Sequence, residues 1–264
     1  MVILITGITS GFGRAMALQL CADGHKVYGT YRKDSEQIPG VTYLKADVQD
    51  KASLCSAVNS VMEKEGHIDT VISNAGMGIG GPLEFTATED AQRQMDVNFM
   101  GMVRLLNQVV PIMRKQHHGQ IICISSIGGL MGLPYQGMYS ASKFAIEGYC
   151  EALRLEVRQF GIYVTIINPG DFFTGFTAAR SKNLPPEAAN AYPGYSASMA
   201  SIESDERSGL QPDYLARRIS RIVRKKRPAN RYIIATTVQK ASVLLKAILP
   251  AKWYDRILAS YYKL

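Results

Sequence analysis

A tyrosine and a lysine one helical turn apart, Tyr139 and Lys143, are the residues of this chain whose types and spacing could most directly carry chemistry. They lie in the stretch YSASKFAIEGY, and Ser126 precedes them at the end of an apolar run, ICISSIGG. Residues i and i+4 share a helix face, so both side chains can point into one cleft. A free tyrosine has a pKa of about 10, which a neighbouring ammonium lowers by favouring the phenolate. The spacing predicts a general acid–base group at Tyr139, with Ser126 placed to hydrogen-bond a substrate oxygen; the alternative is a surface pair on an ordinary amphipathic helix.

The elements that would position these residues alternate along the chain. Apolar strand patterns and helical patterns follow one another, which is typical of a parallel sheet covered on both faces. We therefore predict a single α/β domain over residues 1–264, with a doubly wound, seven-stranded parallel sheet of the Rossmann type. The expected strands lie in residues 2–7, 26–32, 41–48, 69–76, 120–126, 162–170 and 231–236, and the expected helices in 10–25, 51–66, 88–117, 138–160 and 213–227.

Composition narrows the class of protein. The four cysteines are far apart, without a CxxC pair, and indicate reduced thiols and neither a metal site nor a disulfide framework. The N-terminus lacks the features of a secretory signal, and no apolar run approaches the roughly 18 residues that span a bilayer. We expect a cytoplasmic protein. The net charge of +8 is uneven, because residues 213–264 hold 13 Lys/Arg against two Asp. That segment could meet an anionic partner, or it could be a solvated helix face.

A glycine-rich turn, TGITSGFG, follows the first expected strand and opens a helix. Gly7 would allow the tight turn, Gly11 the approach of backbone to a pyrophosphate, and Gly13 close helix–strand packing. The unpaired N–H groups at the helix N-terminus would then face the phosphates. The motif predicts a dinucleotide site, and the alternative is a glycine turn without a ligand.

Several further motifs occur in one order and spacing over about residues 1–175. They are TGxxxGxG at 6–13, Asp47-Val48, NAG at 74–76, Asn98 in MDVNFMG, Ser126, YxxxK at 139–143 and PGDFFT at 169–174. In this set the chain resembles the short-chain dehydrogenase/reductase family. The stretch GGLMGLPYQGMYSASKFAIEGYCEALRLEV is most similar to its hydroxysteroid and retinol dehydrogenase branch.

The resemblance implies an oxidoreductase that interconverts a ketone or aldehyde and an alcohol. The implied catalytic residues are Asn98, Ser126, Tyr139 and Lys143, of which Lys143 also binds the nicotinamide ribose and Asn98 holds a water in a proton relay. The cofactor-binding residues that it implies are Gly7, Thr9, Ser10, Gly11, Phe12, Gly13, Tyr31, Arg32, Asp47, Val48, Asn74, Ala75, Gly76, Tyr139, Lys143, Pro169, Gly170 and Thr174. Relatives usually form homodimers or homotetramers.

The end of the second strand indicates which nicotinamide cofactor is used. NAD-preferring relatives carry an acidic residue there, which binds the ribose 2′-hydroxyl. Here Tyr31 occupies that position and Arg32 follows. A guanidinium binds a 2′-phosphate through charge-assisted hydrogen bonds, so we predict NADP(H). Ser10 weakens this prediction, because many NADP-type relatives have a basic residue in its place, and NAD(H) stays the alternative.

Two C-terminal segments bear on the substrate. Residues 172–209 lie beyond the sixth strand, where open α/β sheets bind ligands, and are rich in Phe, Tyr and Met. We interpret them as a lid over a largely apolar pocket for a steroid, retinoid, fatty or aromatic carbonyl; the alternative is a small polar substrate. Residues 240–264 form an amphipathic tail, for which we expect packing over the cleft or at a subunit interface, with reversible membrane contact as the alternative.

Two other classes of protein were weighed against the enzyme. A dinucleotide sensor without catalysis would keep the glycine turn but would not need the Asn–Ser–Tyr–Lys set, which is complete here. A nucleic-acid-binding protein could use the basic tail, but the chain shows no recognised nucleic-acid module. We therefore expect no nucleic-acid partner.

Overall fold

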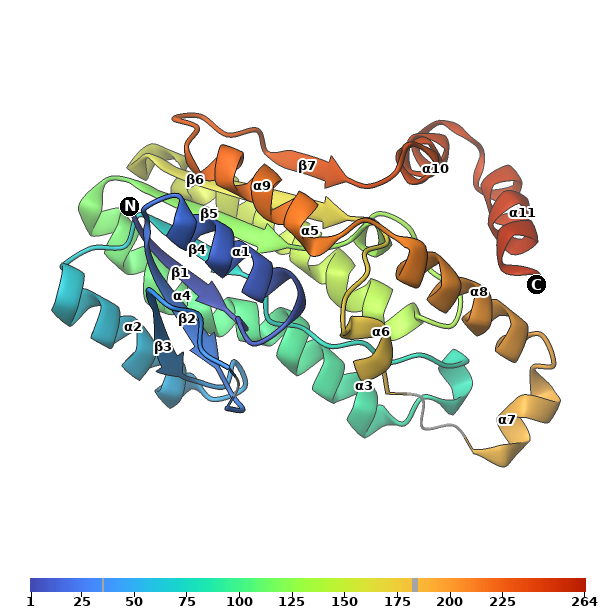
Figure 1. The fold of residues 1–264 in the computed structure, drawn as a ribbon. Coiled ribbons are helices and arrows are strands. Elements are labelled where there is room, and N and C mark those ends of the chain that lie inside the picture. The colour runs from blue at the N-terminus through green and yellow to red at the C-terminus, as the bar shows by residue number, and fades with distance from the viewer. Residues whose placement is uncertain (35, 182–184) are drawn as a thin grey trace.

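Seven short apolar segments form the central sheet in the computed structural model, which describes residues 1–34, 36–181 and 185–264 (Figure 1). The strands are β1 (Val2–Thr6), β2 (Lys26–Tyr31), β3 (Val41–Lys45), β4 (Thr70–Ser73), β5 (Gly119–Ile124), β6 (Ile162–Pro169) and β7 (Arg231–Ile234). All pairs are parallel, and the strand order is β3-β2-β1-β4-β5-β6-β7. The predicted doubly wound, seven-stranded sheet is confirmed.

Helices cover both faces of this sheet. Successive side chains of a strand point to opposite faces, so they pack into two separate hydrophobic cores. Leu4 of β1 packs with α2, α4 and α5 on one face, whereas Ile3 and Ile5 pack with α1 and α9 on the other. The helices of the two layers are α1 (Gly11–Ala22), α2 (Lys51–Glu65), α3 (Thr88–Met95), α4 (Gly101–Gln116), α5 (Gly137–Val157) and α9 (Pro212–Val223).

The helix predicted over residues 88–117 is not continuous. A π-helical turn at Asp96–Met100 separates α3 from α4. This wider turn contains Asn98, whose amide is bonded to the segment after β4 and to α5. The interruption therefore occurs where one side chain joins three elements, and π-turns are often found at functional sites.

The segment after β6 and the tail fold as short helices at the end of the molecule where the C-terminus lies (Figure 1). The predicted lid contains α6 (Phe176–Ala179), α7 (Pro186–Ala191) and α8 (Tyr195–Ser208), and its residues 182–184 lie outside the described residues. The predicted tail forms α10 (Thr237–Ile248) and α11 (Ala251–Tyr262), and Pro250 stands between them. A capping box of Thr236 and Gln239 fixes the start of α10.

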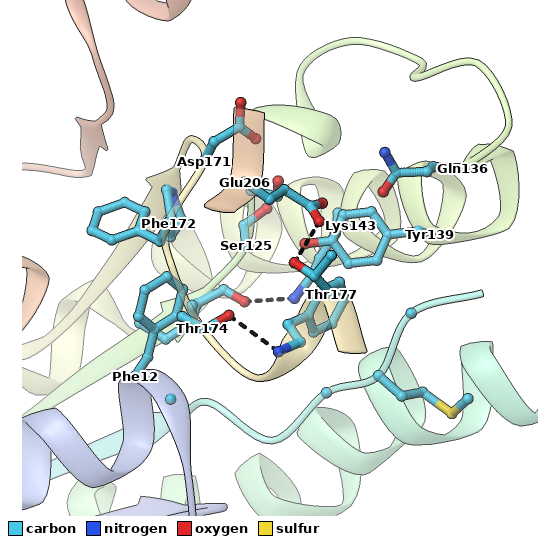
Figure 2. A pocket seen from close by; sticks show the side chains of 18 of the residues that line it. Phe12, Ser125, Gln136, Tyr139, Lys143, Asp171, Phe172, Thr174, Thr177 and Glu206 are labelled. Atoms are coloured by element: carbon cyan, nitrogen blue, oxygen red, sulfur yellow. Dashed lines mark hydrogen bonds between the residues drawn. The ribbon is translucent and has the colours of Figure 1, made fainter. Parts of the chain in front are cut away.

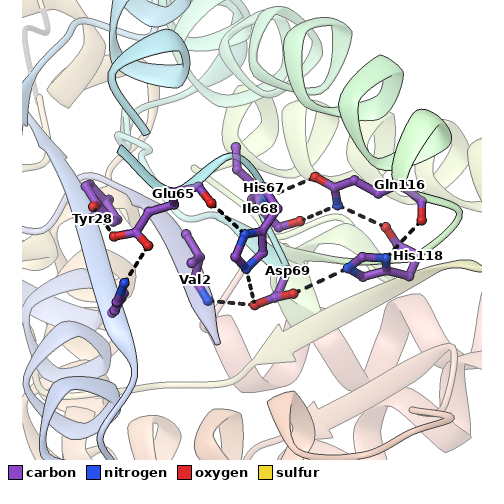
Figure 3. Close-up of polar contacts among 9 residues, drawn as sticks. Val2, Tyr28, Glu65, His67, Ile68, Asp69, Gln116 and His118 are labelled. Atoms are coloured by element: carbon purple, nitrogen blue, oxygen red, sulfur yellow. Dashed lines mark hydrogen bonds and ion pairs between the residues drawn. The ribbon is translucent and has the colours of Figure 1, made fainter. Parts of the chain in front are cut away.

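A polar network links residues at the N-terminal ends of the central strands, on the side of the sheet opposite to the strand C-termini (Figure 3). The Asp69 carboxylate accepts a hydrogen bond of 2.7 Å from the Val2 backbone N–H. The Nε2 atoms of His67 and His118 lie 3.5 and 3.4 Å from the same carboxylate. This edge is far from the strand C-termini, so these two histidines support the fold and take no part in the site described next.

Candidate active site

The C-terminal ends of the strands open into a cavity of about 960 Å³. Its wall contains every residue that the sequence predicts to bind the cofactor except Gly13, and it contains Ser126, Tyr139 and Lys143 of the predicted catalytic set. Asn98 lies behind the wall and is buried. The sheet thus brings together residues that are up to about 170 positions apart in the sequence, at the edge where ligands bind in this class of fold.

The glycine turn has the geometry that its sequence predicts. Gly7 and Gly11 have φ of +74° and +51°, a region that favours glycine. A Cβ on Gly13 would lie 1.9 Å from the Gly7 carbonyl oxygen, so only glycine fits there. Ser10, the N-cap of α1, makes no side-chain capping bond. The first N–H groups of α1 are therefore left for another acceptor, and a pyrophosphate fits this cradle.

Asn74 has a structural role in this cradle. Its Nδ2 donates to the backbone carbonyls of Thr6 and Gly7, at 2.9 and 3.0 Å. In return, the Thr6 hydroxyl accepts hydrogen bonds from the backbone N–H groups of Asn74 and Ala75, at 3.0 and 3.1 Å. The segment after β4 and the glycine turn are thereby held in one arrangement.

The end of β2 forms the other end of the cavity. Arg32 lies there, half-exposed, with its Nη1 3.8 Å from a carboxylate oxygen of Asp47. Arg14 lies outside the cavity wall, because it pairs with Glu36 at 3.0 Å. Lys33 does line the cavity and was missed by the sequence analysis, although its position beside Arg32 was a usable signal. The cations available here to a phosphate are thus Arg32 and Lys33.

Tyr139 and Lys143 project from successive turns of α5 into the opposite end of the cavity (Figure 2). The Lys143 Nζ donates to the Ile124 carbonyl at 2.9 Å and lies 5.6 Å from the centre of the Tyr139 ring. Burial lowers the pKa of Lys143 to about 8. Burial also raises the pKa of Tyr139 to about 12, against the opposing effect of a hydrogen bond with Ser126.

The expectation that Lys143 lowers the pKa of Tyr139 is therefore wrong for the protein alone. Desolvation of the phenolate outweighs the hydrogen bond, and Glu206 and Asp171 add further repulsion. Tyr139 therefore stays protonated at neutral pH. It is ready to donate a proton, and it needs an added positive charge in the cavity to accept one.

Asn98 joins three elements by its side chain. Its Oδ1 accepts from the Met77 N–H at 2.8 Å, and its Nδ2 donates to the Met77 carbonyl and to Ser142 Oγ, both at 3.0 Å. Ser142 Oγ in turn donates to the Tyr139 carbonyl at 2.7 Å. Asn98 thus positions the helix that carries Tyr139, and its role in a water relay stays a prediction.

The substrate end of the cavity differs from the aromatic lid that we expected. Phe172 and Phe176 do line it, and the Phe176 ring lies 5.5 Å from that of Tyr139. Four other aromatic or Met side chains of the predicted lid do not line the cavity, and these are Phe173, Tyr192, Tyr195 and Met199. Tyr192 and Tyr195 pack instead against Tyr135 of the preceding loop. The aromatic composition of the lid does not predict which of its side chains line the cavity.

The wall near Tyr139 contains acidic side chains where we expected aromatic ones (Figure 2). Glu206 of α8 pairs with the buried Arg180 and accepts a hydrogen bond of 2.6 Å from Thr177. Asp171 accepts from the Gln239 side chain at 2.5 Å. Burial, followed by repulsion from Glu206 and Asp205, raises the pKa of Asp171 to about 6.

Among the described residues, these three carboxylates face one guanidinium, that of Arg180, so this part of the wall favours a cationic group. None of the three was predicted from the sequence. For Asp205 and Glu206 the local signal was weak, since acidic residues in a polar helix such as α8 usually face solvent.

The tail supplies the apolar part of the wall. Tyr254 and Tyr262 of α11 are buried, and Leu258 lies between them on the same helix face. Ser198 of α8 donates a hydrogen bond to the Tyr262 carbonyl. The Tyr261 hydroxyl donates to Asp205 at 2.6 Å. One face of the tail therefore folds back over the cleft and is bound to the lid, as we expected.

The fold and this site define an oxidoreductase of the dinucleotide-binding α/β class. The family model described as short chain dehydrogenase matches residues 1–185. The chain belongs to the short-chain dehydrogenase family, whose members act on CH–OH groups.

Two curated relatives differ in how much of the chain they match. The chain is 45% identical over 262 residues to a 3-ketodihydrosphingosine reductase of Bacteroides thetaiotaomicron, covering 99% of this chain and 97% of that protein. It is 38% identical over 191 residues to the human 17-beta-hydroxysteroid dehydrogenase type 1, covering 66% of this chain and 58% of that protein. The first match includes the lid and the tail, whereas the second spans little more than half of the human protein.

Solved structures with this fold are numerous. A short chain dehydrogenase/reductase of Burkholderia phymatum, in complex with NAD, has a TM-score of 0.80 at 24% identity and covers 92% of both chains. A short chain dehydrogenase of Burkholderia cenocepacia, in complex with NADP, has a TM-score of 0.74 at 22% identity, covering 100% of this chain and 97% of the other. At this identity the likeness shows the fold alone.

Proposed function

We propose that this protein is an NADPH-dependent reductase of a long-chain 2-amino ketone, the chemical class to which a 3-ketosphingoid base belongs. The observation that carries the proposal is a cavity wall that is apolar along the tail and acidic beside Tyr139. A substrate with an alkyl chain, a ketone and a neighbouring ammonium matches both parts. The 45% identical reductase, which matches nearly the whole chain, is named for a substrate of this class.

The proposed catalytic roles follow from the positions of the side chains. NADPH supplies the hydride when it is bound. Tyr139 donates a proton to the carbonyl oxygen, and its raised pKa keeps it protonated for this direction of the reaction. Ser126 holds the same oxygen by a hydrogen bond, and Lys143 binds the nicotinamide ribose. Asn98 holds α5 in position through its hydrogen bonds to Ser142 and to the Met77 carbonyl.

The preference for NADP(H) rests on the cations at the end of β2. Arg32 and Lys33 line the cavity there, and no acidic residue stands at Tyr31 to repel a 2′-phosphate. Asp47 lies close to Arg32, so a 2′-phosphate would compete with it for the guanidinium. NAD(H) is the alternative cofactor.

The proposed recognition of the amine rests on Asp171 and its acidic neighbours. A carboxylate whose pKa is raised by burial and by other carboxylates is stabilised when a cation binds beside it. A steroid or retinoid would fill the apolar part of the cavity and leave this acidic part unmatched. The steroid and retinol dehydrogenases among the relatives are therefore the second candidate class, favoured by the apolar wall alone.

A substrate panel with NADPH consumption as readout tests the proposal. It compares a long-chain 2-amino-3-ketone, the same ketone without the amine, and a steroid ketone, each with NADPH and with NADH. We expect the amino ketone with NADPH to give the highest kcat/KM. Equal rates for the ketone without the amine would refute amine recognition, and absence of NADPH binding at sub-millimolar concentration would refute the whole proposal.

Three further expectations about the whole protein stay proposals. We infer that it assembles as a homodimer or homotetramer, that it is located in the cytoplasm, and that residues 172–209 act as a lid. Light scattering tests the first. A further alternative, a non-catalytic dinucleotide sensor, would bind NADPH but turn over none of the panel.

A further inference from the structure

The outer faces of α10 and α11 carry apolar side chains that nothing in the described chain covers. On α10, Val238, Leu244 and Ile248 are 73%, 61% and 64% exposed. Leu244 and Ile248 are one helical turn apart and share a face, Val238 lies in the first turn of α10, and α10 has no buried residue. On α11, the exposed apolar residues Trp253, Ile257 and Tyr261 share one face, and the exposed Leu264 follows the end of the helix. We call these residues together the tail stripe.

The tail stripe is not needed to build the core. The opposite face of α11, with Tyr254 and Tyr262, makes the contacts that hold the tail on the cleft. Apolar side chains left exposed in a row on an amphipathic helix mark a surface that meets something else.

Basic side chains surround the tail stripe. Between residues 237 and 264 the chain has five basic residues and one acidic residue, Asp255. Lys240, Lys252 and Arg256 are exposed, and so is Lys263 near the C-terminus. A helix with exposed Trp, Leu and Ile beside Lys and Arg matches the interfacial zone of an anionic bilayer, where aromatic rings lie among headgroups and cations meet phosphates.

The cavity opens beside this surface. Val238, Ile257 and Tyr261 of the tail stripe are exposed and also line the cavity, so they stand at its mouth. Helices α10 and α11 lie at the end of the molecule remote from the N-terminus (Figure 1). If the protein docked on a membrane through this surface, the mouth of the cavity would face the lipid.

We propose that the tail stripe docks on an anionic membrane surface and presents the mouth of the cavity to it. No helix among the described residues is long and apolar enough to cross a bilayer. The contact is therefore peripheral and reversible. A second copy of the chain is a poorer occupant, because its matching face would bring the same excess of positive charge. The docking itself does not depend on the proposed reaction; only the delivery of a long-chain substrate from the bilayer rests on the proposed function.

The chain has one tryptophan, Trp253, and it lies in the tail stripe, 62% exposed. Its fluorescence is therefore a direct signal of docking that needs no substrate. The full-length protein is titrated with phosphatidylglycerol vesicles and with phosphatidylcholine vesicles, at low and high salt. We expect a blue shift with phosphatidylglycerol that weakens at high salt, and little change with phosphatidylcholine.

The test variant is the double substitution Leu244→Asp/Ile248→Asp on α10. Its control is Leu18→Asp on α1, where Leu18 is 45% exposed. Neither Leu244 nor Ile248 lines the cavity. We expect the double variant to bind phosphatidylglycerol vesicles at least 10-fold more weakly, whereas Leu18→Asp binds like the native protein. Turnover of a water-soluble, short-chain ketone should be the same in all three.

The proposal is overturned if the native protein gives no blue shift, if phosphatidylcholine works as well as phosphatidylglycerol, or if Leu18→Asp weakens binding equally. It is also overturned if light scattering shows that the double variant loses a subunit partner, since the tail stripe would then be an interface between copies. Failure of the substrate panel with normal docking would refute only the proposed reaction.

Discussion

The Lys143 ammonium donates a hydrogen bond of 2.9 Å to the carbonyl oxygen of Ile124, at the end of β5. The bond connects the central helix of the site, α5, to the sheet at the strand that also leads to Ser126. Both groups are buried, so the lysine occupies a fixed position before any ligand enters. Its Nζ lies 5.6 Å from the centre of the Tyr139 ring.

Lys143→Met should impair both steps that we assign to this side chain. The variant keeps the length of the stem but cannot donate to Ile124 or to a ribose. We expect kcat to fall and the Kd for NADPH to rise, because one side chain serves both. Fluorescence titration with NADPH and steady-state kinetics measure the two effects separately. An unchanged Kd for NADPH would show that Lys143 does not bind the ribose.

Tyr139→Phe removes the proposed proton donor and leaves its ring against Phe176. We expect kcat to fall by about 10²–10⁴-fold, the usual contribution of a general acid. The Kd for NADPH should change little, because the hydroxyl alone is lost. Near-normal kcat in this variant would mean that another group transfers the proton.

Arg32→Ala combined with Tyr31→Asp should shift preference from NADPH toward NADH. The change removes the guanidinium and puts in place a carboxylate that can accept a hydrogen bond from a ribose 2′-hydroxyl. The ratio of kcat/KM for the two cofactors is the measurement. Arg14→Ala is the control, because Arg14 is engaged by Glu36 outside the cavity, and the ratio should not move. A native protein that already uses NADH equally well would contradict the prediction.

Asp171→Asn should weaken recognition of an amine and also change the dependence of stability on pH. Losing a hydrogen bond to a charged group costs about 1.5–3 kcal/mol, so KM for the amino ketone should rise about 10- to 100-fold. KM for the same ketone without the amine should stay within about twofold, if amine recognition accounts for the change. Equal effects on both substrates would assign Asp171 a role in shaping the cavity.

The sign of the pH effect follows from the direction of the pKa shift. The folded protein holds the proton of Asp171 more tightly than the unfolded chain, since the pKa is raised from 3.8 to about 6. This contribution to stability is complete below about pH 4 and is lost as the pH rises through 6. Asp171→Asn should therefore gain stability relative to the native protein at pH 8 but not at pH 4, by less than about 3 kcal/mol. Urea denaturation at the two pH values measures this difference.

Most of the fold could be predicted because the central strands β1, β4 and β5 are buried along their whole length, and helices such as α2, α4 and α9 each bury an apolar face. The π-helical turn around Asn98 could not, since it depends on side-chain bonds to Met77 and Ser142, which are distant in the sequence. The division of the tail into α10 and α11 was indicated by Pro250, although α10 begins at Thr237, before the predicted start. Local pattern therefore located the elements but not their irregular turns.

The predicted site was correct where a motif fixes the backbone. Gly7, Gly11 and Gly13 adopt the expected turn because their conformations and contacts exclude other residues. Asp171 and Glu206 were missed, because their approach to Tyr139 depends on how the lid folds over the cleft. Sequence spacing carries no information on that packing. Asp171 lies inside the PGDFFT motif, but the resemblance assigns no role to its carboxylate, and Glu206 lies outside all of the motifs.

The last turn of the chain has a practical consequence for handling the protein. Ser198 of α8 donates to the Tyr262 carbonyl, and Tyr261 donates to Asp205 of the same helix. A movement of α8 away from the cleft that leaves α11 in place would therefore break both hydrogen bonds. A purification tag fused after Leu264 would be next to these hydrogen bonds and could disturb them. A tag before Met1 would lie at the other end of the molecule (Figure 1). Kinetic constants should be compared between these two fusions before either is assigned to the native enzyme.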